Sequence, residues 1–530
     1  MGASGAQLLL AALALVACLA EGARAAHVLV VFPVGSGSHR NLGQAIARGL
    51  HARGHRVTVV SPFPRQQPLQ NWTDVAIPNT IHFFGQTSGF LELGSSNNFK
   101  KFKMMNDYGI SSCEVYLQDE NVKRLMNSNE KFDVMIIEIF FCECFLTLSH
   151  RLKVPIIQFN TFWPGAWTGD IVGSPSPYAY VPDTFLAYTD HMTFFERLHN
   201  AVFGLYCKLI REMYLLPKME DLVRRHVNDP TMPTLSELDR STSMLLTNSH
   251  VSLQYPRPLA PALVEVGGMH VNPPKKLPKD LQEYLDGAKE GAIYFSLGSN
   301  LRSADLPNET RSAIVNAFSK LKQRILWKWE AETFPGKPDN LKLGKWLPQS
   351  DILAHKNIRL FITHGGFLST LETVYHGVPV IGIPVFSDQD LNMLQAESKG
   401  YGIRLRLNNI TSETFYWAIT EILNNPRYQT KAKDLSRLYH DRPRTPMEEL
   451  VYWTEYVARH KGASHMRSAA VDLSWYQLCL LDVIIFMLTI VAVVASLLVI
   501  ILRVVLRFLF SSTPKNIAEN GIKKNLKKKQ

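Results

Sequence analysis

A buried strand, a loop of small residues, a helix and a second strand follow one another near the start of the chain. This order restricts the fold more than any other feature. Residues 27–33 (HVLVVFP) form an apolar run that predicts a buried strand, and the small-residue loop 35–38 follows it. Residues 41–53 have the apolar spacing of a helix, and residues 56–60 predict the next strand. Such a βαβ unit predicts a parallel sheet with a right-handed crossover.

The same pattern begins again in the second half of the chain. A proline-rich, basic stretch at residues 272–280 predicts a linker. We expect further strands at residues 134–137, 155–159, 292–297, 325–329, 360–363 and 378–384, and helices at residues 309–321, 367–375 and 392–400. The sequence therefore predicts an α/β protein with two Rossmann-like, doubly wound domains, residues 26–271 and 281–475, that face each other across a cleft.

The apolar run at residues 483–502 contains 20 residues without a charge. As a helix it would be about 30 Å long, which matches the hydrocarbon core of a bilayer. Arg503 and Arg507 follow it, so the basic tail 503–530 is expected to be cytoplasmic. We prefer a C-terminal transmembrane helix to the alternative of a buried core helix.

The N-terminal end predicts entry into the secretory pathway. Residues 8–20 are apolar and Ala23-Arg24-Ala25 resembles a cleavage site, so residues 1–25 are interpreted as a signal peptide rather than an N-terminal anchor. Together with the predicted span, this makes a single-pass type I protein whose domains lie in the lumen.

Two further features agree with the endoplasmic-reticulum membrane. The final Lys527-Lys528-Lys529-Gln530 resembles a dilysine retrieval signal, although a basic tail that only contacts anionic lipid is the alternative. Sequons at Asn71, Asn308 and Asn409 are candidate N-glycosylation sites.

The net charge of +11 does not predict nucleic-acid binding, because its distribution is uneven. The tail from Arg503 onward carries eight basic residues and one acid, so it supplies seven of the eleven net positive charges. Four cysteines, Cys113, Cys142, Cys144 and Cys207, would lie in an oxidising compartment; one disulfide is compatible with them, but their spacing does not select the partners.

Residues 192–210 predict an amphipathic helix between the two domains. Its apolar residues are Phe195, Leu198, Val202, Leu205, Tyr206 and Leu209. Packing in the core is the expectation that we prefer. Contact with a membrane interface or an acceptor channel is the alternative.

The segment 346–389 carries the clearest chemistry. A predicted strand ends in Thr363-His364-Gly365-Gly366 and a helix begins at about residue 367. The two glycines would let the backbone approach a ligand closely, and the N-terminus of the helix offers free amides and the positive end of its dipole. Both features suit a phosphate. Glu372 lies on that helix, where its carboxylate could accept ribose hydroxyls; a solvated helix face is the alternative. The loop Gly35-x-Gly37 is no dinucleotide fingerprint, because residue 40 is Arg rather than Gly.

These motifs closely resemble the signature of the UDP-glycosyltransferases of the glucuronosyltransferase type. Their amino-acid sequences are most similar to those of the insect branch. The resemblance covers essentially the whole chain. It is carried by residues 295–299 (FSLGS), 346–349 (WLPQ), 364–366 (HGG), 388–389 (DQ), 441–443 (DRP), 452–453 (YW) and 459–462 (RHKG). It implies the GT-B arrangement of two Rossmann-like domains.

The resemblance also implies a UDP-sugar site in the second domain. Trp346 would stack on uracil, and Gln349 would lie beside the base and ribose. The remaining donor-binding residues would be Ser299, His364, Gly366 and Ser369 at the diphosphate, Glu372 at the ribose, and Asp388 and Gln389 at the sugar hydroxyls. Vertebrate members usually carry Asn where this chain has Leu368, so one polar contact is missing or replaced.

No metal or permanently bound cofactor is expected; the UDP-sugar is a co-substrate. Asp388-Gln389-Asp390 has the D-x-D form that elsewhere binds a divalent metal, but it follows a strand of a domain already equipped to hold phosphate at a helix N-terminus.

The first domain would hold the acceptor and the catalytic pair. His39 lies at the position where the family carries its general base. The pKa of a free histidine is about 6.5, which suits proton removal at neutral pH. Relatives orient that histidine with an aspartate, and counting along the chain places Glu138 at that position.

We therefore expect an inverting transferase that moves a hexosyl group, glucose in preference, from a UDP-sugar to a small lipophilic alcohol or phenol. A glucuronosyltransferase is the alternative within the family. A non-catalytic, membrane-tethered binding protein for lipophilic molecules is the alternative outside enzymes. Whether the chain forms a homo-oligomer is left open.

Overall fold

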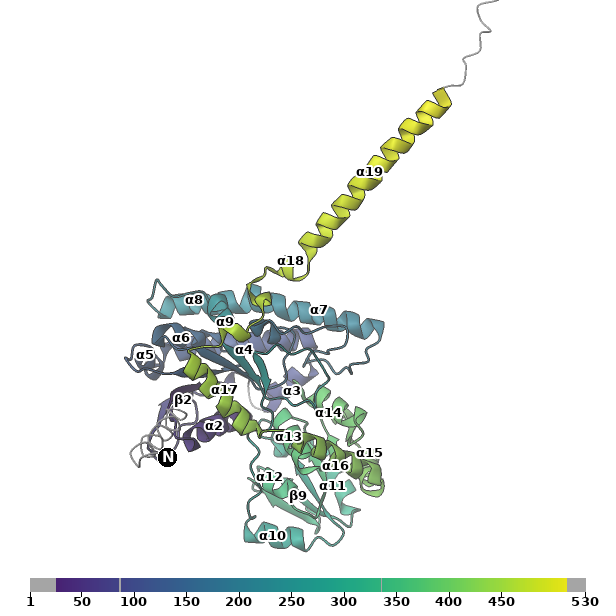
Figure 1. The fold of residues 1–530 in the computed structure, drawn as a ribbon. Helices are drawn as coiled ribbons and strands as arrows, with labels where there is room; N and C mark the ends of the chain where they lie inside the picture. Colours follow the sequence, from purple (N-terminus) through teal and green to yellow (C-terminus); the bar gives the residue numbers. More distant parts are fainter. Residues whose placement is uncertain (1–24, 85–86, 335, 512–530) are drawn as a thin grey trace, which may run out of the picture. The chain divides into compact units, whose positions relative to one another are not determined.

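The computed structural model describes residues 25–84, 87–334 and 336–511 of the chain. The expected signal peptide, apart from its last residue, and the lysine-rich end lie outside these residues. The chain forms two compact units, Met1–Ser468 and Ala469–Gln530. The first unit contains two α/β domains (Figure 1).

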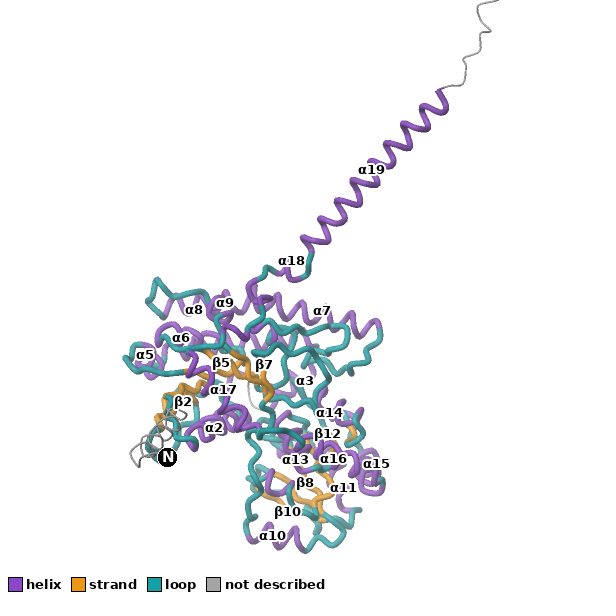
Figure 2. Tube along the Cα trace, in the orientation of Figure 1, coloured by secondary structure: helices purple, strands orange, loops and turns teal. Residues whose placement is uncertain are grey.

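The first domain is built on a seven-stranded parallel sheet in the order β3-β2-β1-β4-β5-β6-β7 (Figure 2). Its strands are β1 (His27–Val31), β2 (Arg56–Ser61), β3 (Trp72–Ala76), β4 (Val134–Ile139), β5 (Ile156–Asn160), β6 (Met244–Thr247) and β7 (Leu263–Glu265). Its helices are α2 (Gly37–Ala52), α3 (Thr87–Ser95), α4 (Asn98–Gln118), α5 (Glu120–Met126), α6 (Thr147–Leu152), α7 (Phe194–Ile210), α8 (Leu216–His226) and α9 (Leu235–Arg240). The order reverses between β1 and β4, as in a doubly wound fold.

The second domain has a six-stranded parallel sheet in the order β10-β9-β8-β11-β12-β13. Its strands are β8 (Ala292–Ser296), β9 (Arg324–Lys328), β10 (Leu341–Gly344), β11 (Ile358–Thr363), β12 (Val380–Gly382) and β13 (Gly402–Arg404). Its helices are α10 (Lys279–Asp286), α11 (Asn308–Ser319), α12 (Gln349–Leu353), α13 (Phe367–His376), α14 (Gln389–Ser398), α15 (Ser412–Asn424) and α16 (Pro426–His440). The reversal here lies between β8 and β11.

The side chains of β1 alternate between the two faces of the sheet, which explains why every residue of this strand from Val28 to Val31 is apolar. Val28 and Val30 belong to the core on one face of the sheet, while Leu29 and Val31 belong to the core on the other. Successive side chains of a strand point to opposite faces, so a strand covered by helices on both sides must be apolar at every position.

The chain crosses between the domains twice. After α16 it returns to the first domain as α17 (Pro446–His460), whose Leu450, Val451 and Val457 are buried in the same core as Val28 and Val30. The Tyr439 hydroxyl donates to the Gly267 carbonyl at 2.9 Å, so the two crossings touch each other.

Several boundaries differ from those that the sequence predicts. Helix α2 begins at Gly37 rather than at residue 41, because Ser36 has extended backbone (φ −91°, ψ 145°) and serves as the N-cap. His39 therefore lies in the first turn of α2. Five strands were not expected from the pattern: β3, β6, β7, β10 and β13. They have three to five residues each, too few to show a period.

Core packing, our preferred expectation for the apolar residues of 192–210, is wrong for most of them. Phe195, Leu198, Val202, Leu205 and Leu209 are between 48% and 77% exposed. The buried face of α7 consists instead of Asn200, Phe203, Gly204 and Cys207.

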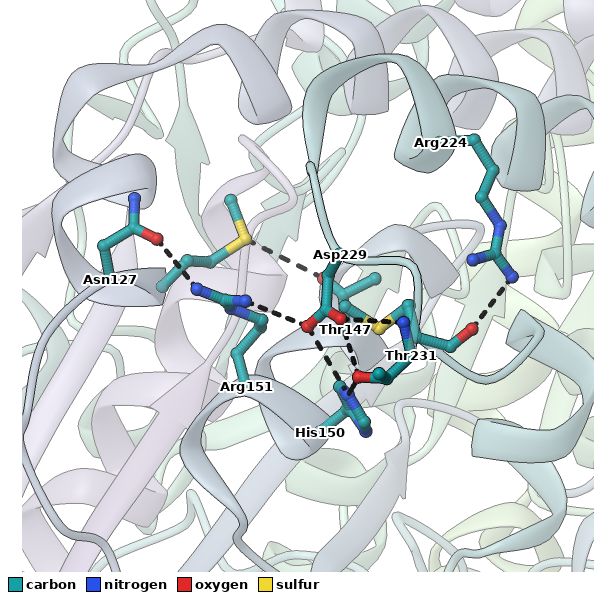
Figure 3. Close-up of polar contacts among 9 residues, drawn as sticks. Asn127, Thr147, His150, Arg151, Arg224, Asp229 and Thr231 are labelled. Atoms are coloured by element: carbon teal, nitrogen blue, oxygen red, sulfur yellow. Dashed lines mark hydrogen bonds and ion pairs between the residues drawn. The ribbon is translucent and has the colours of Figure 1, made fainter.

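A polar network fastens the chain after α8 to α6 (Figure 3). Asp229 accepts from Arg151 at 2.9 Å and from the Thr231 hydroxyl at 2.7 Å, and His150 lies 3.5 Å from the same carboxylate. The Thr231 hydroxyl and the Arg151 guanidinium lower the pKa of Asp229 to about 2. The carboxylate is therefore ionised at every physiological pH, and the end of α8 is held in place.

One disulfide joins Cys113 on α4 to Cys144 in the turn that follows β4. The sequence left this pairing undetermined. Cys142 and Cys207 are buried free thiols.

We expect removal of this disulfide to destabilise the first domain. The bridge closes a loop with a sequence separation of 31, for which restriction of the unfolded chain corresponds to about 3–4 kcal/mol. The double variant Cys113→Ala/Cys144→Ala should unfold about 5–10 °C below the parent in a thermal scan. The control Cys207→Ala, which breaks no bridge, should stay much closer to the parent; equal losses in both variants would contradict this account.

The second unit contains α18 (Trp475–Leu478) and α19 (Leu481–Ser511). Helix α19 has 31 residues, a mean hydropathy of 3.2 over its most apolar window, and no buried residue, so by length and composition it is a candidate membrane span. It extends the predicted span 483–502 at both ends and carries Arg503 and Arg507 within its last turns. The three sequon asparagines, Asn71, Asn308 and Asn409, are exposed on the first unit.

Candidate functional site

A cavity of about 360 Å³ lies between the two domains of the first unit. Its lining includes residues that follow β1 and β4 in the first domain and residues that follow β8 and β11 in the second. These are the carboxyl ends of the strands at which each sheet reverses its order, where ligands bind in open α/β sheets. Every donor-binding residue expected from the sequence lines this cavity, and so does His39.

His39 and Glu138 meet in the first domain because β1 and β4 are parallel neighbours. Val31 pairs with Ile137, so the end of β4 lies level with the loop after β1. His39 Nδ1 is hydrogen-bonded to Glu138 Oε1, and the carboxylate is 1% exposed. The Phe140 ring packs edge-on against the imidazole at 4.6 Å between centroids. With Nδ1 engaged, Nε2 is the ring nitrogen left to face a ligand.

The loop after β11 has the form that a phosphate requires. Gly365 has φ +81°, and Gly366 is the N-cap of α13, so the first amides of that helix have no intrahelical partner. The His364 ring lies between two glycines: a Cβ added at Gly298 or Gly366 would come within 2.6 Å of a ring atom. Burial, together with the nearby Lys328 cation, lowers the pKa of His364 to about 4. His364 is therefore a neutral donor at physiological pH.

Lys328 is a site residue that the sequence reasoning missed. It ends β9, its Nζ donates to the Gly298 carbonyl at 2.8 Å, and it pairs with Glu330 at 2.9 Å. Of the described residues that line the cavity, it is the only lysine or arginine. Its position at the end of a strand next to the FSLGS strand was the signal that could have found it.

Glu372 faces the cavity rather than an outer, solvated face of α13. Gln349 Nε2 donates to Glu372 Oε2 at 2.6 Å and to the Ser369 hydroxyl at 3.0 Å, which joins three of the expected residues. Burial raises the pKa of Glu372 to about 7, although the Gln349 bond acts in the opposite direction. The Trp346 side chain at the rim is 68% exposed, which leaves a free aromatic face.

Asp388 and Gln389, at the start of α14, also line the cavity. Both are at most 4% exposed. Asn392 donates to Asp388 at 2.5 Å and to the Gly365 carbonyl at 2.9 Å, and so ties the start of α14 to the glycine loop. Burial raises the pKa of Asp388 to about 6. Asp390 instead pairs with Arg404 at 2.8 Å, so the two acids of the D-x-D sequence do not act together.

Comparison with known proteins identifies the family of this chain. Residues 27–516 match the family model described as UDP-glucoronosyl and UDP-glucosyl transferase. The chain belongs to the UDP-glycosyltransferase family. It is 37% identical to the UDP-glycosyltransferase UGT5 of Dactylopius coccus, covering 91% of this chain and 93% of that protein. It is also 33% identical to the mouse 2-hydroxyacylsphingosine 1-beta-galactosyltransferase, covering 87% and 85%.

Solved glycosyltransferase structures share the fold of this transferase. The glycosyltransferase VinC in complex with dTDP aligns with a TM-score of 0.57 over 82% of this chain and all of that one, at 14% sequence identity. CalG4, the calicheamicin glycosyltransferase, aligns with a TM-score of 0.54 at 15% identity. The GT-B arrangement expected from the sequence is thereby confirmed.

The family establishes the donor class: the transferase uses a UDP-sugar as co-substrate and has no permanent cofactor. Among residues 25–84, 87–334 and 336–511, no group of three or more His, Cys, Asp or Glu could hold a metal ion.

Leu368, where vertebrate members usually have Asn, lies on the first turn of α13. In the transferase it lines the cavity and packs against the core of the first domain. An apolar contact between the domains thus occupies the place of the expected polar one.

Proposed function

We propose that this transferase moves a neutral hexosyl group, with glucose as the first choice, from a UDP-sugar to the hydroxyl of a small lipophilic alcohol or phenol. The observation that carries the proposal is that His39, hydrogen-bonded to the buried Glu138, lines the same cavity as the glycine loop of the second domain. Residues 26–271 would bind the acceptor and residues 281–475 the donor.

In this mechanism His39 Nε2 takes the proton of the acceptor hydroxyl. The oxygen attacks the anomeric carbon from the side opposite the diphosphate, and the bond from that carbon to the leaving oxygen breaks with its electron pair passing to UDP. An α-linked donor therefore gives a β-glycoside. Glu138 is a positioning residue here: its carboxylate holds Nδ1–H and stabilises the imidazolium that forms.

On the donor side, Trp346 would stack on uracil and Gln349 would lie beside the base and ribose, whose hydroxyls Glu372 would accept. Ser299, His364, Gly366 and the amide of Ser369 would hold the diphosphate. Lys328 is the cation that would offset the charge growing on UDP, because neutral His364 contributes donation only.

The part of the cavity lining that the first domain supplies supports an apolar acceptor. Its side chains include Ile81, Leu93, Met105, Phe140 and Phe162. Such a lining would exclude water from the acceptor hydroxyl and select lipophilic molecules.

The charge of the sugar end supports a neutral hexose. Asp388 and Gln389 are expected to bind sugar hydroxyls there. Lys328, the one lysine or arginine of the described lining, pairs with Glu330 and would already be engaged by the diphosphate of the donor. A glucuronate carboxylate would therefore meet the Asp388 acid without a free cation to balance it.

A donor panel tests the proposal. With 1-naphthol as acceptor, we expect kcat/KM for UDP-glucose or UDP-galactose to exceed that for UDP-glucuronate by about tenfold or more, the cost of one unbalanced contact of roughly 1.4 kcal/mol. Mass analysis identifies the product and NMR its β configuration. Preference for UDP-glucuronate would instead support a glucuronosyltransferase, and no product from any donor would support a non-catalytic binding protein.

We also propose residence in the endoplasmic-reticulum membrane with the domains in the lumen, based on α19 and on exposed Asn71, Asn308 and Asn409. Resistance of the full chain to alkaline carbonate extraction would support the span. A mass decrease on treatment with an N-glycosidase would support lumenal exposure.

A further inference from the structure

The loop that precedes His39 is hydrogen-bonded to the donor side of the cavity. The Ser36 hydroxyl donates to Asn300 Oδ1 at 3.0 Å, although the two residues are 264 positions apart in the sequence. Asn300 follows Ser299, which would hold the diphosphate, in the loop after β8. Ser36, His39 and Asn300 all line the cavity. A hydrogen bond therefore joins the start of the helix that carries the proposed base to the loop that would hold the donor.

Ser36 does not use its side chain as a helix N-cap usually does. An N-cap serine ordinarily accepts a hydrogen bond from the second or third amide of its helix. The backbone of Ser36 has the extended conformation of an N-cap, but its hydroxyl makes no such bond to α2. Because this hydroxyl donates to Asn300 instead, a contact between the domains replaces the local capping bond.

The hydroxyl of Ser36 has a second partner next to the proposed base. Ser38 Oγ lies 3.0 Å from Ser36 Oγ. A serine hydroxyl has a single proton, and that of Ser36 is used on Asn300, so Ser38 must be the donor in this second bond. Ser38 immediately precedes His39 in the first turn of α2. The hydrogen bonds thus run from Asn300 through Ser36 to the residue before His39.

The two loops also touch through their backbones. A Cβ added at Gly37 would lie 3.0 Å from both Cβ and Oγ of Ser299, so the absence of a side chain at Gly37 permits this approach. Lys328 Nζ donates to the Gly298 carbonyl at 2.8 Å and holds the other end of the donor loop. Residues 298–300 are therefore held between Lys328 and the start of α2, so a shift of this loop would also shift the first turn of that helix.

We propose that Asn300 is a positioning residue for His39. A diphosphate bound at Ser299 would fix the donor loop, and Asn300 would then hold the first turn of α2 so that His39 Nε2 meets the acceptor hydroxyl. Glu138 orients the imidazole ring, whereas Asn300 fixes the backbone that carries it. This inference rests on the proposed function, in which His39 is the base.

The link predicts a loss of rate rather than of donor affinity. Misplacement of a catalytic group by about 1 Å can lower the rate by roughly 10²-fold, and loss of one of several supports should cost less. Asn300 would act on the base through Ser36, so removing either partner should have the same effect. Removing both should then cost no more than removing one.

The test uses the full chain with 1-naphthol and the UDP-sugar that the parent prefers. The variants are Asn300→Ala, Ser36→Ala and the double variant. The matched control is Lys399→Ala, which removes another hydrogen bond between the domains, from Lys399 Nζ to the Ser252 carbonyl at 3.1 Å. Neither partner of that bond is among the described residues that line the cavity. A thermal scan shows whether each variant is folded.

We expect kcat to fall about tenfold in each single variant and no further in the double variant. KM for the donor and the dissociation constant of UDP should stay within about twofold of the parent, and Lys399→Ala should keep kcat within about twofold. An unchanged kcat in Asn300→Ala would overturn the proposal. Multiplied losses in the double variant, or an equal loss in Lys399→Ala, would also overturn it. So would a fall in UDP affinity as large as the fall in kcat, since Asn300 would then bind the donor.

His39→Ala, measured beside these variants, separates failure of the link from failure of the proposed mechanism. If His39→Ala loses transfer while Asn300→Ala and Ser36→Ala keep the rate of the parent, only the link is wrong. If His39→Ala keeps the turnover of the parent, His39 is not the base and the positioning role of Asn300 is refuted with it.

Discussion

Replacing His39 with alanine is expected to lower kcat for transfer to a phenol by about 10²–10⁴-fold, the usual contribution of general acid–base catalysis. The donor site should survive, because no donor-binding residue bonds to the imidazole. UDP affinity, measured by calorimetry, should therefore stay within about twofold of the parent. The reason for the loss is specific: Nε2 is the free nitrogen of a ring whose Nδ1 is held by Glu138.

Glu138→Gln provides the matched control for this account. The amide can still bond to Nδ1, but it no longer offers a negative charge to the imidazolium that forms during transfer. We expect an intermediate fall in kcat, about 10–100-fold, with KM for the donor unchanged. If His39→Ala retained the turnover of the parent, proton removal by this histidine would be refuted. If it lost UDP binding as well, the residue would be structural.

The His39–Glu138 pair illustrates what the sequence can and cannot predict. Both strands that precede these residues were expected in the first domain, and the family resemblance named Glu138 as the partner of His39. The structure shows that β1 and β4 are parallel neighbours, so the side chains at their carboxyl ends meet. The glycine loop before α13 could also be predicted from the sequence, because the end of a strand and the start of a helix are both marked by local sequence. Eight of the thirteen described strands follow from the alternation of strands and helices. The short strands β3, β6, β7, β10 and β13 do not, and all of these except β6 lie at a sheet edge.

Other features depend on distant packing that no local pattern records. The apolar period of α7 was read correctly as one side of a helix, but the buried side is built from Asn200, Gly204 and Cys207 as well as Phe203. Hydrogen bonds to the Asn200 amide make that burial favourable, and apolarity alone could not reveal it. The Cys113–Cys144 pairing likewise depends on how α4 packs near the end of β4.

Glu372→Ala should weaken UDP binding by about 100-fold, equivalent to roughly 2.7 kcal/mol. The proposed ribose hydroxyls would lose a charged acceptor, and hydrogen bonds to charged groups contribute about 1.5–3 kcal/mol each. The Gln349 amide would also lose its 2.6 Å partner. An unchanged dissociation constant in calorimetry would remove Glu372 from the nucleotide site, whatever the activity of the variant.

The raised pKa of Glu372 adds a pH dependence that a merely structural carboxyl would not produce. With a pKa of about 7 in the free protein, the group is largely protonated at pH 6, and binding of ribose hydroxyls must expel that proton. The dissociation constant of UDP-glucose, whose diphosphate remains ionised throughout, should be flat above pH 8 and rise below pH 7 toward about tenfold per unit. Glu372→Gln is neutral at every pH, so it should lose this slope and retain only the weaker dependence near pH 6 that Asp388 would cause. A parent and variant with the same profile between pH 6.5 and 8 would show that donor binding does not require an ionised Glu372.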